Sequence, residues 1–82
     1  MKVEPRDAIL KLLSERSADK TICPSEAARA IGGENWRDLM PTVHAAARAL
    51  AEEGIVDLRQ GGDRVGTEGI VGPYRIGGRG RD

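Results

Sequence analysis

Residues 42–56 read TVHAAARALAEEGIV, and the spacing of the apolar side chains changes within this stretch. Pro41 precedes it and suits the first turn of a helix, where no backbone N–H is needed. The apolar residues that follow recur at intervals of three and four, which predicts one buried face formed by Val43, Ala46, Ala47 and Leu50. Gly54 suits the end of a helix because it tolerates a left-handed backbone. A helix of about residues 41–53 is therefore expected.

After this helix the period of the apolar residues becomes two, as in a β-strand. In residues 55–60, Val56 and Leu58 share one face, which we expect to point inward. Asp57 and Arg59 share the other face, which we expect to point away from the core.

A hairpin is expected to follow this strand. Glycine and aspartate at 61–63 predict a turn. The return strand is expected at 73–76, with Tyr74 inward and Arg75 outward. The glycine-containing segment 64–72 between them is expected to be mobile.

The N-terminal half of the chain contains two further helical patterns. The first is expected over about Pro5–Ser17, with apolar residues on one face and charges on the other. Thr21–Cys23 favours a strand that is too short to be stable alone but can pair with a hairpin edge. Pro24 begins the second helix, and the glycine pair at 32–33 ends it.

A short helical turn is expected around residues 35–38, with Asn35 as its N-cap. Pro41 cannot lie inside a helix that begins at Trp36 without the loss of a hydrogen bond. A break in helicity is therefore expected between Leu39 and Pro41.

Helix, short strand, helix, turn, helix and hairpin is the element order of a winged helix-turn-helix domain. We expect an α+β fold that is mainly α, with three main helices, a short turn helix and a small antiparallel sheet with a wing. The 82 residues fit one domain. Residues 1–76 are expected to form it, and residues 77–82 to be a disordered Gly/Arg tail.

Three motifs carry a resemblance to a known family. They are KTICPSEAARAI at 20–31, WRDLMP at 36–41, and the stretch 46–54. Together they resemble a small, mainly bacterial family, domain of unknown function 3253, over about residues 5–76. The resemblance implies a winged-helix fold and brings no established activity with it.

The composition excludes several classes of function. Thirteen basic and thirteen acidic residues give a net charge of zero, which rules out a histone-like protein that acts through bulk positive charge. One Cys and one His exclude a Cys-built zinc site and a His cluster, so neither metal nor cofactor is expected. No phosphate-cradling glycine loop occurs, and His44 has no nucleophile at a recognisable spacing, so we expect no enzyme. Without a membrane span or a signal-peptide core, a cytoplasmic location is expected.

In a winged-helix domain the helix at 41–53 would lie in the major groove of duplex DNA. Arg48 could bind a guanine edge or a phosphate, and His44 could donate a hydrogen bond. The segment 59–81 has five arginines against two acidic residues, a net charge of +3, which suits a wing that contacts phosphates or the minor groove. The candidate DNA-binding residues are Thr42, His44, Arg48, Arg59, Arg64 and Arg75.

Ala45 and Ala49 leave the groove-facing side of this helix poor in hydrogen-bond donors. We therefore expect weak or dimer-dependent binding of duplex DNA, in transcriptional regulation. The alternative is a protein-interaction module in which these arginines are ordinary solvated residues, and the zero net charge favours it. Trp36 would either close the long turn onto the core or anchor such a partner. Cys23 is expected to be a small buried filler, whereas an exposed thiol at this helix N-terminus would suit a redox sensor.

Overall fold

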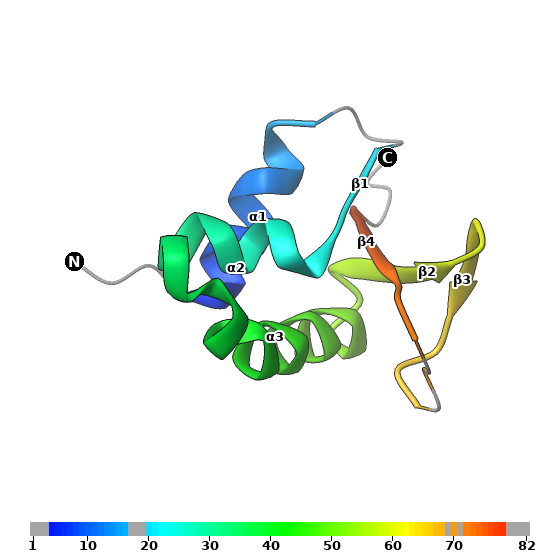
Figure 1. Cartoon of the computed structure of the whole chain (residues 1–82). Coiled ribbons are helices and arrows are strands. Elements are labelled where there is room, and N and C mark those ends of the chain that lie inside the picture. The colour runs from blue at the N-terminus through cyan, green and yellow to red at the C-terminus, as the bar shows by residue number, and fades with distance from the viewer. Residues whose placement is uncertain (1–3, 17–19, 69, 71, 79–82) are drawn as a thin grey trace.

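A computed structural model of the chain describes residues 4–16, 20–68, 70 and 72–78. The fold is α+β and mainly helical, with the helices gathered beside a small antiparallel sheet (Figure 1). The four strands lie in the order β1-β4-β2-β3. The elements are α1 (Pro5–Ser14), β1 (Thr21–Ile22), α2 (Pro24–Gly32), the 3-10 segment η1 (Gly33–Leu39), α3 (Met40–Glu52), β2 (Val56–Gln60), β3 (Asp63–Val65) and β4 (Arg75–Gly78).

One aliphatic core joins the helices to the sheet. The predicted stripe of α3 is confirmed at Val43, Ala47 and Leu50, which are buried, whereas Ala46 is half-buried. The buried apolar residues come from α1, α2, α3 and three of the strands. They are Ala8, Ile9, Ile22, Ala27, Ala28, Val43, Ala47, Leu50, Val56, Leu58 and Ile76. Such a core is built from small and branched aliphatic side chains, which close-pack without aromatic rings.

Each α-helix has a proline in its first turn. α1 begins at Pro5 as expected and ends at Ser14, and the expected end at Ser17 lies outside the described residues. α2 begins at Pro24, and Gly33 follows it with a φ of 56°, a backbone conformation that glycine adopts readily. The glycine stop of α2 is therefore confirmed.

The segment between α2 and α3 changes its type of helix at the predicted place. The 3-10 hydrogen bonding of η1 ends at Leu39, and α-helical hydrogen bonding begins at Met40, one residue before Pro41. Because Pro41 has no N–H to donate, it occupies the first turn of α3, where none is needed. Asn35 has non-helical backbone angles and marks a kink within η1, where the second helical turn starts as expected. Its side chain forms no capping hydrogen bond within the described part of the chain.

The sheet contains one strand more than the sequence predicts. β1 pairs with β4, as expected. The return strand directly after the turn is β3, which pairs with β2 through Gln60 and Asp63. Gly61 and Gly62 have φ values of 60° and 88°, which permits a two-residue turn between paired strands. The assignment of residues 64–72 to one mobile segment is therefore wrong at Arg64 and Val65, which belong to β3.

β4 pairs with the other edge of β2, where Arg59 lies opposite Arg75. It continues through Gly77 and Gly78, two residues that the sequence analysis assigns to the tail. β4 extends beyond its last apolar residue because it pairs with a strand on each side. Gly77 lies opposite Thr21 of β1 and opposite Asp57 of β2. The remainder of the expected tail, 79–82, lies outside the described residues.

Candidate nucleic-acid interface

The outer face of α3 is exposed and made mostly of small side chains. Thr42, Ala45, Arg48 and Ala49 are all exposed, as the sequence predicts for a groove-facing surface. Within the described part of the chain, Arg48 forms neither a salt bridge nor a hydrogen bond. This face can approach a flat or convex partner closely, because only Arg48 extends far from the helix.

His44 is the exception on this face, since it is half-buried. Its Nδ1 atom lies 2.6 Å from the hydroxyl oxygen of Tyr74, and the two ring centroids are 5.5 Å apart. Tyr74 is itself half-buried, and this burial raises the pKa of its hydroxyl, while the charge of Arg48 acts in the opposite direction. His44 therefore holds the segment ahead of β4, and one of its two ring nitrogens is occupied within the fold.

The segment that joins β3 to β4 follows the flank of α3. Near the end of the helix, the Thr67 hydroxyl donates to the Glu52 carboxylate at 3.4 Å. Further back along the helix, Arg48 and His44 line a pocket of about 230 Å³ together with Ile70 and Tyr74. Figure 1 shows this connection passing below the sheet beside α3. The described residues of this connection thus contact α3 at Glu52 and share a pocket with Arg48 and His44.

The Asp57 carboxylate contacts two of the predicted DNA-binding arginines. It accepts a hydrogen bond from Arg59 Nη2 at 3.3 Å and forms an ion pair with Arg64 Nη1 at 3.5 Å. Asp57 lies on the face of β2 opposite Val56 and Leu58, as expected, but it is only 7% exposed because Arg59 and Arg64 cover it. A buried carboxylate needs compensating cations and hydrogen bonds, and the strand ladder places Arg59 and Arg64 opposite each other beside it.

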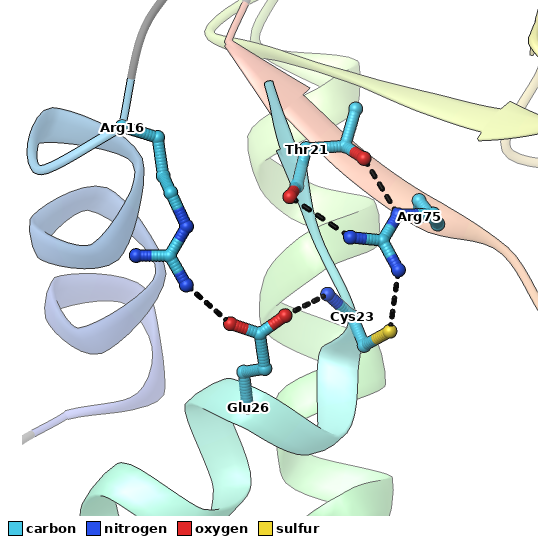
Figure 2. A network of polar contacts seen from close by, with 5 residues as sticks. All are labelled: Arg16, Thr21, Cys23, Glu26 and Arg75. Carbon is cyan, nitrogen blue, oxygen red and sulfur yellow. Dashed lines mark hydrogen bonds and ion pairs between the residues drawn. The ribbon is translucent and has the colours of Figure 1, made fainter.

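Arg75 points outward from β4 as predicted, but its guanidinium lies back along the sheet (Figure 2). Its Nε atom donates to the Thr21 hydroxyl at 2.6 Å, and Nη2 donates to the Thr21 carbonyl at 3.0 Å. Its Nη1 atom donates to the Cys23 sulfur at 2.8 Å. These three bonds fasten β4 to β1 and to the start of α2, and they leave two of the five guanidinium N–H groups for a phosphate.

Cys23 is half-buried and lies at the start of α2. The expectation of a buried apolar filler is wrong, because its sulfur accepts the bond from Arg75 and its N–H donates to Glu26 at 3.0 Å. The other oxygen of Glu26 accepts from Arg16 at 2.6 Å, so the turn that follows α1 joins the same network (Figure 2). Polar contacts of this residue with two elements explain why it does not enter the core.

Trp36 is also half-buried and packs against the edge of the core. The guanidinium carbons of Arg29 and Arg37 lie 4.4 and 4.6 Å from the centroid of its ring. Part of the Trp36 ring thus packs onto the core as expected, and the rest of the ring does not.

The six predicted DNA-binding residues therefore separate into three groups. Thr42, His44 and Arg48 share α3, Arg59 and Arg64 meet at Asp57, and Arg75 belongs to the junction of β1 and β4. Sequence reasoning missed Tyr74 as a contact of the candidate interface. The sequence held one signal for this contact: Tyr74 was expected to point inward, and it is one of only two aromatic residues in the chain.

The described residues contain no group of three or more His, Cys, Asp or Glu side chains arranged to hold a metal ion. No helix in the described part of the chain is long and apolar enough to cross a membrane.

These features define a small α+β domain, mainly helical, whose antiparallel sheet is fastened to its last helix. Residues 3–79 match the family described as "Protein of unknown function (DUF3253)", so the chain belongs to that family. The resemblance carried by the motifs at 20–31, 36–41 and 46–54 is confirmed. No curated protein matches the chain.

Proposed function

We propose that this chain is a winged helix-turn-helix domain that binds duplex DNA, with α3 as the helix that enters the major groove. The order α1, β1, α2, α3 and the following strands supports this proposal. The observation that carries it is the exposed face of α3, where Arg48 stands between Ala45 and Ala49 without an ion-pair partner in the described part of the chain. A helix with such a surface can lie deep in the groove and place one guanidinium at a base edge or phosphate.

The proposed binding is weak for a single copy of the domain. Arg75 has three of its five N–H donors bonded to Thr21 and Cys23, and Arg59 bonds to Asp57. Of the predicted arginines, Arg48 and the more exposed Arg64 are therefore the main cations that remain for phosphates. Non-specific DNA binding depends mainly on phosphate neutralisation and has dissociation constants of about 10⁻⁴ to 10⁻⁶ M at physiological salt. A homodimer or a fused partner would raise the effective affinity, and a role in transcriptional regulation in the cytoplasm would require one of them.

Amide-shift titration of the full chain with a random 12-base-pair duplex at ~50 mM salt tests the proposal, because low salt strengthens phosphate contacts. We expect shifts centred on residues 42–49, with smaller shifts at Arg64. Arg48→Gln should weaken binding several-fold, since it removes the exposed cation of this face. Lys11→Gln is the matched control, because Lys11 is an exposed cation on α1 that pairs with Glu15.

A titration in which residues 42–49 do not shift, even at ~50 mM salt, would exclude α3 as the DNA-reading helix. Equal losses of affinity in Arg48→Gln and Lys11→Gln would show general charge attraction and no defined interface.

A further inference from the structure

Arg29, Trp36 and Arg37 form a compact surface cluster on α2 and η1, separate from the outer face of α3. Both arginines are exposed, and Trp36 is half-buried. Their guanidinium carbons lie 4.4 and 4.6 Å from the centroid of the indole ring. These distances are those of cation–π contacts, which hold both guanidiniums close to the ring.

A guanidinium that packs on an aromatic ring uses its planar face, so its N–H donors remain at the edge. In the described part of the chain, neither Arg29 nor Arg37 forms a hydrogen bond or a salt bridge. The ring therefore limits the side-chain motion of two cations whose donor edges are available. A carboxylate that bound there would meet preorganised bidentate partners and a partly exposed apolar ring.

The surrounding charges favour a protein ligand over a nucleic acid. Glu34 and Asp38 flank Trp36 in η1 and are both exposed, so η1 carries two acids for its one arginine. A phosphate backbone with its regular charges would be repelled by these acids, whereas a peptide can place single carboxylates at the arginines. Tryptophan and arginine are also the residues most enriched at the centres of protein interfaces.

We propose that the Arg29–Trp36–Arg37 cluster binds an acidic segment of a partner protein, with carboxylates on the two guanidiniums and an apolar side chain against the indole. This site is independent of the proposed DNA interface. A domain with both surfaces could be recruited by a partner while α3 remained accessible.

The test uses the indole N–H signal of Trp36, which is the only tryptophan in the chain. The full chain is titrated with the blocked peptide EELEE and, in parallel, with QQLQQ, which has the same length and apolar residue without the charges. We expect EELEE to shift the indole signal saturably at peptide concentrations up to ~1 mM, the range of weak short-peptide binding. QQLQQ should leave it unchanged.

The double variant Arg29→Gln/Arg37→Gln should lower the affinity for EELEE about tenfold or more, as for truncated interface anchors. Both positions are exposed, so this variant should fold, and Lys11→Gln should bind EELEE like the unchanged chain. Identical responses to EELEE and QQLQQ, or unchanged binding by the double variant, would overturn the proposal. A 12-base-pair duplex that shifts the indole signal at lower concentration than EELEE would also overturn it and assign the cluster to phosphate. Neither result bears on the shifts expected at 42–49.

Discussion

The Nδ1 atom of His44 lies 2.6 Å from the hydroxyl oxygen of Tyr74, and this contact joins α3 to the segment that leads into β4. The two residues are 30 positions apart in the chain. Because Arg48 acts electrostatically on the same hydroxyl, the fastened end of the segment lies beside the exposed face of α3. Any partner that binds this face therefore meets the segment as well as the helix.

Tyr74→Phe should remove the hydrogen bond and keep the ring. We expect a loss of about 1 kcal/mol in the free energy of unfolding, as for one net hydrogen bond, measured by urea denaturation. Amide exchange should quicken at Gly72 and Tyr74 more than in β2, because the released segment opens locally. Unchanged exchange at these two amides would mean that packing of the ring, and not its hydroxyl, holds the segment on α3.

Arg75→Gln should destabilise the fold more than Arg64→Gln does. Arg75 donates to Thr21 twice and to Cys23 once, whereas Arg64 has a single ion pair at 3.5 Å. We expect a loss of about 1–2 kcal/mol for Arg75→Gln, the value of charged hydrogen bonds reduced for solvent exposure. For Arg64→Gln the loss should be below about 1 kcal/mol. Urea denaturation of both variants checks the order, and equal losses would show that the β1 contacts of Arg75 contribute little.

Local patterns in the sequence predict the elements of this fold better than they predict the contacts of its charged residues. Prolines, glycines and apolar periods indicate the helix starts and the glycine stop of α2, because each of these depends on a few neighbouring residues. The strand β3 has only three residues and no apolar alternation, so its pairing with β2 leaves no periodic signal.

The candidate site is less accessible to sequence reasoning because Arg75 and His44 find partners far away in the chain. Arg75 and Thr21 are 54 positions apart, and their contact depends on the pairing of β1 with β4. The exposed face of α3 was predictable from the helical period alone. The half-burial of His44 was not, since it follows from the contact of Tyr74 with the helix.

Position 62, in the turn between β2 and β3, requires glycine, whereas position 66, which follows β3, does not. Gly62 has a φ of 88°, which side-chain-bearing residues rarely adopt, although a Cβ there would meet no neighbouring atom. Gly66 has open space as well, and its φ lies outside the left-handed region. Gly62→Ala should therefore lower stability by about 1 kcal/mol, while Gly66→Ala should be neutral or slightly stabilising. Thermal denaturation of the two variants compares the effects, and equal melting temperatures would contradict a strained turn.

Arg6 and Glu53 connect the start of α1 to the end of α3 by two hydrogen bonds of 2.9 Å. The hydrogen bond from Arg6 holds the pKa of Glu53 below its ordinary value of 4.5. Because the pKa of Glu53 is lower in the folded state, its contact with Arg6 contributes fully to stability above about pH 4.5. This contribution is lost as the pH falls further. Arg6→Gln should thus be less stable than the unchanged chain at neutral pH, and the difference should be smaller at ~pH 3. Urea denaturation at both pH values measures this, and a stability difference that persists undiminished at low pH would show that the contribution of Arg6 is not electrostatic.

The salt dependence of DNA binding should reflect which arginines the fold leaves available. Each phosphate neutralised contributes about 0.9 to the slope of log affinity against log salt. If Arg48, Arg64 and Arg75 all contacted phosphates, the slope would be near 3, but the bonds of Arg75 to β1 reduce the expected value to about 2. Arg48→Gln and Arg64→Gln should each lower the slope by about 0.9, and Arg75→Gln should leave it unchanged even though it weakens the fold. Fluorescence anisotropy with a labelled random duplex between ~50 and ~200 mM salt supplies the slopes, at a temperature where every variant is folded. A drop of about 0.9 in Arg75→Gln would mean that Arg75 leaves Thr21 and binds a phosphate, so that DNA competes directly with the contact between β1 and β4.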